Sequence, residues 1–280
     1  MSVGTWQRVS KRRPCPICGK PDWCLVGTDG GAICARVESP HSQGEAGWYH
    51  PTEPGKVAVP VRREDPPPAH PAGWWKSYTE RCQSDGAGRL PGLARELGVT
   101  VEALERLCAG WSGDAWTFPM RTPAGRILGV RLRLLSGRKL AVRGGREGLF
   151  YPADLPEHPE GSTLLICEGP TDTAAALDLG ALAVGRPSCT GGVRHVVELV
   201  RKRHPGQVVV VADDDGPGRR GAEALANTLL PYVRRVQVVT PPAKDLRAWV
   251  CAGATRAGLL GLIAGTPCRR LRISKEKRTA

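Results

Sequence analysis

The sequence has no long hydrophobic run. No segment of its 280 residues approaches the roughly 18 consecutive apolar residues that a membrane-spanning helix requires. The N-terminus also lacks the apolar stretch of a secretory signal peptide, and it carries Arg8, Lys11, Arg12 and Arg13 instead. We therefore expect neither a membrane span nor a signal peptide, and we expect the protein to be cytoplasmic.

Aromatic and acidic residues are scarce. Aromatic residues make up 5% of the chain, whereas there are 35 glycines and 25 prolines. The hydrophobic fraction of 41% still supports a folded core, in one large domain or two small ones. The 40 Lys and Arg exceed the 27 Asp and Glu, which gives a formal net charge of +13. This excess favours a polyanionic partner such as nucleic acid, although an arginine-rich genome composition would also produce it.

The ten cysteines are distributed unevenly. Four of them fall within residues 15–34, and the other six are scattered singly. A disulfide framework would space them more evenly, in a shorter secreted chain. The pattern therefore predicts one metal site together with ordinary buried thiols in a reducing compartment.

The clustered cysteines are candidate zinc ligands: Cys15, Cys18, Cys24 and Cys34. Zinc prefers four such ligands in a tetrahedron, and a C-x2-C turn places two thiolates on one side of the ion. We expect Cys24 and Cys34 on two short strands of a hairpin, with His41 as the competing fourth ligand. Residues 14–50 have too few apolar side chains to fold unaided, which favours zinc over a free-thiol loop. Trp23 could stack on nucleic-acid bases or pack in this small core, and we favour the core.

Composition divides the chain into five parts. Residues 51–72 include Pro66, Pro67 and Pro68 and few large apolar residues, which predicts a semi-rigid linker. The last twelve residues hold six Lys or Arg, which predicts a loose basic tail. The expected parts are a zinc ribbon at 1–50, the linker at 51–72, a helical and β-strand part at 73–160, an α/β domain at 161–268, and the tail at 269–280.

Periodicity gives the expected elements. Apolar residues at three- and four-residue steps between 93 and 107 predict two short helices separated at 98–100. Strands are expected at 116–120 and 127–133 around a turn at 123–125, followed by a basic strand region at 137–143. From 163 to about 265 apolar strands alternate with helices, which predicts a mostly parallel sheet with right-handed crossovers.

Acidic residues follow two of these expected strands. Glu168 and Asp172 come after the strand at 163–167, and Asp213, Asp214 and Asp215 come after the strand at 208–212. Parallel sheets bind ligands beyond the carboxyl ends of their strands. Carboxylates gathered there suit a hard cation such as Mg²⁺ or Mn²⁺. Helix capping would explain Asp172 or Asp215 singly, but it explains poorly three consecutive aspartates. The pattern predicts metal-dependent phosphoryl transfer.

The two acidic motifs, Glu168-Gly169-x-x-Asp172 and Asp213-x-Asp215-x-x-Gly218, resemble the Toprim domain of primases, topoisomerases and some nucleases. A zinc ribbon, a proline-rich linker and a Toprim core together are similar to the primase branch. The resemblance implies an α/β fold with a Toprim-like, mostly parallel sheet and flanking helices. A small β-rich basic subdomain and an N-terminal zinc ribbon would precede that sheet.

The resemblance also implies roles for the acidic residues. Glu168 would be the acid at the first strand end, and Asp213 and Asp215 would bind the divalent metal ions, Mg²⁺ or Mn²⁺. Asp172 would be a supporting carboxylate. Asp245, in a segment that resembles a further Lys-Asp element of primases, is a lesser candidate for the same metal site.

The function expected from this resemblance is synthesis of short RNA primers on single-stranded DNA from nucleoside triphosphates, in a phage, plasmid or other mobile element. Basic side chains that could hold the triphosphate and template precede the acidic motifs, although they could equally form a solvated face: Arg131, Arg133, Lys139, Arg143 and Arg146. No G-x-x-x-x-G-K-[ST] motif is present, so we expect any helicase partner to be a separate protein. The alternatives are a Toprim nuclease and a non-catalytic recombination mediator that binds DNA.

Overall fold

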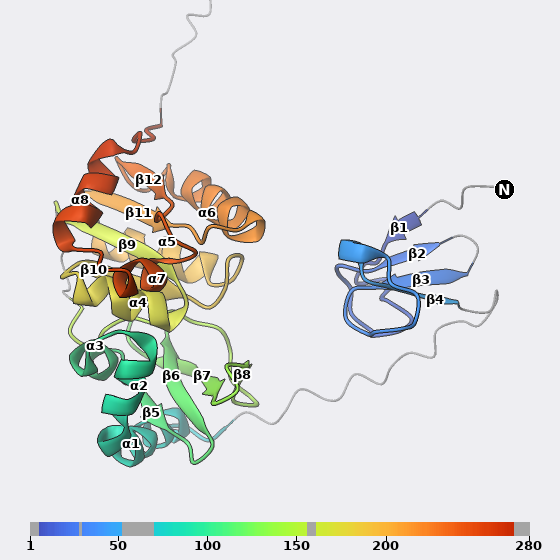
Figure 1. The fold of residues 1–280 in the computed structure, drawn as a ribbon, viewed down its shortest axis with the longest axis horizontal. Helices are drawn as coiled ribbons and strands as arrows, with labels where there is room; N and C mark the ends of the chain where they lie inside the picture. Colours follow the sequence, from blue (N-terminus) through green and yellow to red (C-terminus); the bar gives the residue numbers. More distant parts are fainter. Residues whose placement is uncertain (1–5, 28–29, 52–69, 156–160, 272–280) are drawn as a thin grey trace, which may run out of the picture. The chain divides into compact units, whose positions relative to one another are not determined.

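The computed structural model describes residues 6–27, 30–51, 70–155 and 161–271 (Figure 1). The chain forms two compact units, Met1–Pro67 and Pro68–Ala280, and each is described by itself. Most of the expected linker at 51–72 and most of the expected basic tail at 269–280 lie outside the described residues.

The first unit is a small antiparallel sheet. Its strands pair in the order β1-β2-β3-β4, and they are β1 (Trp6–Arg8), β2 (Leu25–Gly27), β3 (Gly31–Cys34) and β4 (Trp48–Pro51). A short 3₁₀ helix, η1 (Gly44–Ala46), precedes β4. The buried cluster of this unit consists of Val9, Cys15, Cys24 and Cys34. A core of this size gives little hydrophobic stabilisation, which agrees with a unit that depends on a metal ion.

Trp23 does not belong to this core. Its side chain is 67% exposed, so the expectation that it packs inside the ribbon is wrong. The space is instead filled by the cysteine side chains and Val9. The backbone of Trp23 has a φ of 64°, a left-handed conformation that costs about 1–3 kcal/mol for a bulky residue. The local fold therefore holds a large apolar side chain outward in a strained conformation.

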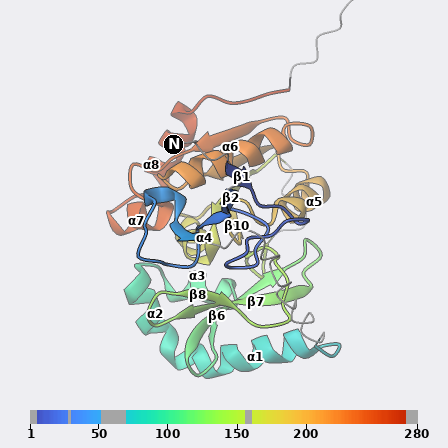
Figure 2. The ribbon, with the colours of Figure 1, turned by 90° about the vertical axis from the view of Figure 1, so that its right-hand side faces the viewer.

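The second unit begins with helices packed on an antiparallel sheet. The helices are α1 (Trp74–Gly86), η2 (Ala87–Arg89), α2 (Leu90–Leu97) and α3 (Val101–Arg106). The strands pair in the order β5-β6-β7-β8, and they are β5 (Gly110–Trp111), β6 (Ala115–Arg121), β7 (Ile127–Leu134) and β8 (Lys139–Ala141). Figure 2 shows α1 below β6, on the side away from the second sheet of this unit.

The two predicted helices and the predicted hairpin of this region are confirmed. Gly98 ends α2 in the left-handed conformation, and Thr100 caps α3 by accepting a hydrogen bond from the backbone N–H of Ala103. Helix α1 was not predicted. Its buried residues are Thr79, Cys82 and Gly86, so it has no stripe of large apolar side chains that periodicity could detect.

The rest of the second unit is a parallel α/β layer structure. Its strands pair in the order β10-β9-β11-β12, and they are β9 (Thr163–Glu168), β10 (Leu182–Arg186), β11 (Gln207–Val211) and β12 (Val236–Val239). The three pairings are all parallel, as predicted. The helices are α4 (Gly169–Asp178), α5 (Val193–Arg203), α6 (Gly216–Leu229), α7 (Leu246–Cys251) and α8 (Arg256–Gly265).

The strands are buried on both faces because helices cover each side of the sheet. Leu164 and Ile166 pack with α5 and α6, whereas the alternate residues Leu165 and Cys167 pack with α4, α7 and α8. The second of these clusters continues through α2 and α3 to Trp116 and the β6 strand. The antiparallel and parallel parts of the unit therefore share one hydrophobic core.

Backbone pairing also joins the two sheets of this unit. Leu149 exchanges hydrogen bonds with Arg121 at the end of β6, and its neighbour Phe150 exchanges them with Gly185 in β10. This fixes the end of β6 beside the carboxyl end of β10, whose last residue Arg186 pairs in register with Glu168, the first acid of the motifs.

Among the residues that the structure describes, no helix has both the length and the apolar character that crossing a bilayer requires.

Candidate active site and zinc site

Glu168 is the last residue of β9 and immediately precedes α4. The next residue, Gly169, has a φ of 78°, so this turn from strand to helix requires glycine. Burial raises the pKa of Glu168, and the positive charges of Arg186 and Lys139 partly offset the effect. Glu168 therefore lies half-buried at the carboxyl end of the sheet, between acidic and basic neighbours.

Asp172 lies in the first turn of α4 and is buried. Its Oδ1 accepts a hydrogen bond of 2.9 Å from the backbone N–H of Arg247 in α7. Burial, together with the negative charges of Asp245 and Asp213, raises the pKa of Asp172 to about 7, although the hydrogen bond from Arg247 opposes the shift. This carboxylate ties α4 to α7 and faces the other acids, which fits the supporting role that the sequence resemblance implies.

Asp213 lies two residues beyond the end of β11, the strand that pairs in parallel with β9. Burial and the neighbouring carboxylates of Glu168 and Asp245 together raise its pKa to about 6. A side chain at Gly218 would lie 2.9 Å from the carbonyl oxygen of Asp213, so the glycine of the motif keeps this loop tight.

The three consecutive aspartates have different surroundings. Asp215 caps α6, because its Oδ1 accepts a hydrogen bond of 2.6 Å from the backbone N–H of Gly218. Asp214 is exposed and forms an ion pair with Arg219. Capping thus explains the position of Asp215, while the half-buried Asp213 makes no capping contact and needs another explanation.

Asp245 reaches the site through the loop before α7. The backbone N–H of Asp214 donates to the carbonyl of Lys244 at 2.8 Å, which brings this loop beside the end of β11. Asp245 itself caps α7 by accepting from the backbone N–H of Ala248 at 2.6 Å. Its negative charge raises the pKa values of Asp172 and Asp213, so it is part of the same acidic cluster.

The five predicted acids thus gather at the carboxyl edge of the sheet: Glu168, Asp172, Asp213, Asp215 and Asp245. They interact through charge, but they do not all come into direct contact. In the described part of the chain, the four cysteines are the only such set of three or more ligand groups with atoms mutually within 4.8 Å. Ionised carboxylates so close together repel one another, which contributes to their raised pKa values, and a hard divalent cation between them would relieve the repulsion. The donor set therefore fits Mg²⁺ or Mn²⁺.

Arg186 is a member of the site that sequence reasoning missed. It is the last residue of β10, lies in register with Glu168, and is 1% exposed. Its Nη1 donates to the carbonyl oxygen of Cys189 at 2.7 Å. Burial lowers the pKa of Arg186, and the charges of Glu168 and Asp213 oppose that shift. Arg186 is the last residue of its strand and precedes Pro187, and nothing in this sequence pattern indicates that its guanidinium is buried next to the acids.

The predicted basic residues have separate roles. Lys139 in β8 is exposed, and its charge lowers the pKa values of Glu168 and Asp213. Arg131 donates to the carbonyl of Pro187 at 3.1 Å, and Arg133 pairs with Glu96 at 2.9 Å. The other two, Arg143 and Arg146, are exposed in the segment after β8. Of this set, Lys139 is the one whose charge acts on the acids.

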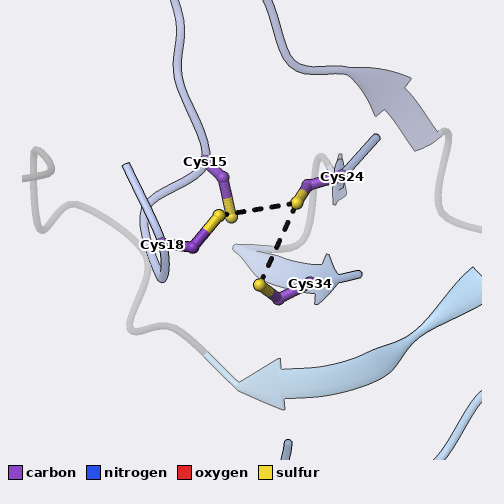
Figure 3. A group of neighbouring side chains, drawn as sticks. All are labelled: Cys15, Cys18, Cys24 and Cys34. Atoms are coloured by element: carbon purple, nitrogen blue, oxygen red, sulfur yellow. Dashed lines mark hydrogen bonds between the residues drawn. The ribbon is translucent and has the colours of Figure 1, made fainter. Parts of the chain in front are cut away.

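The four cysteines of the first unit converge, as predicted (Figure 3). Cys24 Sγ lies 3.7 Å from Cys18 Sγ and 3.9 Å from Cys34 Sγ. The edges of a tetrahedron with Zn–S bonds of about 2.3 Å are about 3.8 Å long. The sulfur positions therefore fit zinc. His41 is exposed and packs edge-on against Tyr49, so Cys24, and not His41, completes the cluster of four side chains.

The thiols differ in how easily they ionise. Burial raises the pKa of Cys15 to about 12 and also raises that of Cys24. Burial opposes ionisation of Cys18 too, but the backbone N–H of Lys20 and the neighbouring thiols lower its pKa to about 7. Zinc binds thiolates, so loading this site must release protons from the more basic thiols.

Backbone and side-chain donors surround the sulfur atoms. The backbone N–H of Val37 donates to Cys34 Sγ at 3.3 Å, and that of Ala35 donates to Cys24 Sγ at 3.5 Å. Arg36 Nη1 lies 3.6 Å from Cys24 Sγ. Donors of this kind stabilise negative charge on metal-bound sulfur and fix the ligand orientation.

Comparison with known proteins adds a fold relationship. No protein-family model matches the chain, and no curated protein matches it either. Solved structures do match. The E. coli primase catalytic core aligns with a TM-score of 0.55 and 19% identity, over 70% of this chain and 79% of its own. The DnaG primase catalytic domain bound to single-stranded DNA aligns with a TM-score of 0.56 and 19% identity, over 69% and 79%.

A third match is the Aquifex aeolicus primase with its zinc-binding and RNA polymerase domains. It aligns with a TM-score of 0.57 and 16% identity, over 70% of this chain and 61% of its own. The chain has the fold of the Toprim primase cores. The expected Toprim-like α/β architecture is therefore confirmed.

The zinc site predicts a clear difference between two variants. Cys24→Ser should lose most of the bound zinc and unfold the ribbon, because the remaining three thiolates leave the tetrahedron incomplete. His41→Ala should keep about one zinc ion per chain, because His41 lies outside the cysteine cluster. Zinc content by atomic emission of the purified proteins checks both. Normal zinc content in Cys24→Ser would contradict the assignment.

The acidic cluster predicts a pH-dependent effect of Mg²⁺. The pKa values of Asp213 and Asp172 are raised from 3.8 to about 6 and about 7. Their stabilising contribution is therefore fully present below pH 3.8 and is lost as pH rises through these raised values. Mg²⁺ binds the ionised form, so the Mg²⁺-induced rise in Tm should grow between about pH 5 and pH 8.

Calorimetric melting with and without Mg²⁺ across this range checks the prediction. Asp213→Asn removes one of the titrating carboxylates and should flatten the dependence. An equal Mg²⁺ effect at pH 5 and pH 8 in the unsubstituted protein would contradict a shared cation site.

Proposed function

We propose that this protein is a DNA primase that synthesises short RNA primers on single-stranded DNA by metal-dependent nucleotidyl transfer. The observation that carries the proposal is the acidic cluster at the carboxyl edge of a parallel sheet in a fold shared with primase cores. The cysteine site fits the zinc-binding domain named for the Aquifex protein. The fold alone does not set the reaction, so the argument rests on the charges of the site.

In primer synthesis the 3′-hydroxyl oxygen of one nucleotide bonds to the α-phosphorus of a nucleoside triphosphate. The bond to the bridging oxygen breaks, pyrophosphate leaves, and the hydroxyl proton passes to solvent. Bound Mg²⁺ or Mn²⁺ would activate the attacking oxygen and neutralise charge on the leaving group. In this proposal Glu168, Asp213 and Asp215 hold the cations and Asp245 assists. The buried Asp172 orients the cluster through its bond to α7.

Positive side chains would hold the substrates. Lys139 is the best placed for the triphosphate, because its charge already acts on Glu168 and Asp213. Arg143 and Arg146 are exposed in the segment after β8 and would contact template phosphates. Because Arg131 and Arg133 already contact Pro187 and Glu96, they would position this strand as well as contribute charge.

The single-stranded DNA named for one structural neighbour supports single-stranded DNA as the template here. We also propose the divisions 1–50, 51–72, 73–160, 161–268 and 269–280, a separate helicase, and a mobile-element setting. A Toprim nuclease would use the same acids, and a non-catalytic DNA-binding mediator would not need them.

Substitution of the acids tests the reaction. Glu168→Gln and Asp213→Asn should each reduce primer synthesis by at least about a hundredfold, because each removes a metal ligand. Binding to single-stranded DNA should survive, since no repulsive charge is added. The matched control is Asp214→Asn, because Asp214 is exposed and paired with Arg219.

The assay uses single-stranded DNA, four ribonucleotides and Mg²⁺ or Mn²⁺, with products sized on a gel. A short ladder that both variants lose and Asp214→Asn keeps supports a primase. A shortened template without new product indicates a nuclease. An intact template without new product indicates a binding protein.

Lys139 gives a second test. Lys139→Gln should raise the KM for ribonucleotides about tenfold, because one charge that faces the triphosphate is lost. Its exposed neighbour Arg138 offers the matched control, since no charge effect of Arg138 on the acids is resolved. Steady-state kinetics of Lys139→Gln and Arg138→Gln check this, and equal KM values in the two variants would contradict the role of Lys139.

A further inference from the structure

Trp23 is the least explained large side chain in the first unit. It is 67% exposed, and its indole makes no ring contact or hydrogen bond within the described residues. Its backbone φ of 64° is one of three positive values among the non-glycine residues that the structure describes. A bulky residue in this conformation is a genuine outlier, and outliers of this kind concentrate at functional sites.

The residues on both sides hold Trp23 in this conformation. Arg36 Nη1 donates to the carbonyl oxygen of Asp22 at 2.9 Å, and the Arg36 guanidinium also pairs with the Asp22 carboxylate. On the other side, Cys24 is fixed by its sulfur contacts and by the hydrogen bond from the Val9 N–H to its carbonyl. The turn is therefore clamped at Asp22 and at Cys24, and the indole between them is directed outward.

The strained backbone at Trp23 is not offset by any stabilising contact of its side chain within the described residues. A glycine or asparagine at this position would adopt the same backbone more easily. An exposed indole also loses the hydrophobic gain that would favour tryptophan inside a core. The choice of tryptophan therefore points to a ligand that stacks on a flat aromatic ring.

The surroundings indicate which ligand. Exposed cations occur on the same unit, at Lys11, Arg12 and Lys20. Proteins combine exposed aromatic rings, which stack on unpaired bases, with cations on the same domain that hold the phosphate backbone. We propose that Trp23 stacks on an unpaired base of single-stranded DNA, and that the Arg36 clamp exists to present it. The choice of DNA as the ligand rests on the proposed function.

The test uses the full-length, zinc-loaded protein and a fluorescein-labelled 20-nucleotide oligo(dT), with binding followed by fluorescence anisotropy. Trp23→Gly should weaken binding roughly five- to 150-fold, the effect of losing one stacked base. Trp23→Tyr should stay within about threefold of the unsubstituted protein, because tyrosine also stacks. A 20-unit abasic strand should bind equally weakly to the unsubstituted protein and to Trp23→Gly.

Stability separates stacking from a structural role. Trp23→Gly should keep its zinc and melt no lower than the unsubstituted protein, because the left-handed backbone suits glycine. Trp6→Leu is a matched control, since Trp6 packs edge-on against Tyr49 and its loss should act on stability. Loss of zinc or a lower Tm in Trp23→Gly would overturn the proposal, as would unchanged oligo(dT) binding.

Salt dependence supplies an independent readout. Lys20→Gln should reduce the slope of log K against log salt, because it removes a phosphate contact, whereas Trp23→Gly should leave that slope unchanged. If Trp23→Gly weakened binding to oligo(dT) and to the abasic strand equally, the effect of the substitution would not depend on bases. That result would also overturn the proposal.

Primer synthesis measured in parallel distinguishes the two failures. Primers from the unsubstituted protein, with no effect of Trp23→Gly on binding, would leave the primase and remove the stacking role. Binding that depends on Trp23, with no primers under any condition, would support the stacking role and contradict the primase.

Discussion

Mutual repulsion among carboxylates at one edge of a buried sheet is the constraint on which the second unit depends. Burial and neighbouring negative charge raise the pKa values of Asp172 and Asp213, so folding alone does not favour their ionised forms. The scaffold must therefore hold them in place. Parallel pairing of β9 with β11 aligns the two strand ends, and the hydrogen bond from Arg247 to Asp172 fixes α4 against α7.

Positive charge balances this cluster at two depths. The buried guanidinium of Arg186 interacts with Glu168 and Asp213 where water cannot screen its charge, and Lys139 is exposed on the antiparallel sheet. Arg186 belongs to the parallel sheet and Lys139 to the antiparallel sheet, and the bridges made by Leu149 and Phe150 join these two sheets. The antiparallel sheet thus contributes a charge, that of Lys139, to the acidic site.

The zinc ribbon follows the same logic with a different ion. Its buried cluster is three cysteines and Val9, so the metal replaces the hydrophobic core that so short a segment cannot build. Donors from the backbone and from Arg36 surround the sulfur atoms, and Arg36 also clamps the turn that carries Trp23. One arginine therefore connects the metal site to the exposed indole.

The sequence by itself determined the ligand sets and the layer order. Acids that follow apolar strands had to meet at one edge, because parallel strands share their carboxyl ends, and a C-x2-C turn had to place two thiolates together. Burial was decided only by the tertiary structure. Periodicity gave no sign that Arg186 is enclosed, that α1 packs through small residues, or that Trp23 faces solvent, because each depends on neighbours distant in the chain. Likewise, only the fold could choose Cys24 over His41, since sulfur positions depend on how the hairpin closes.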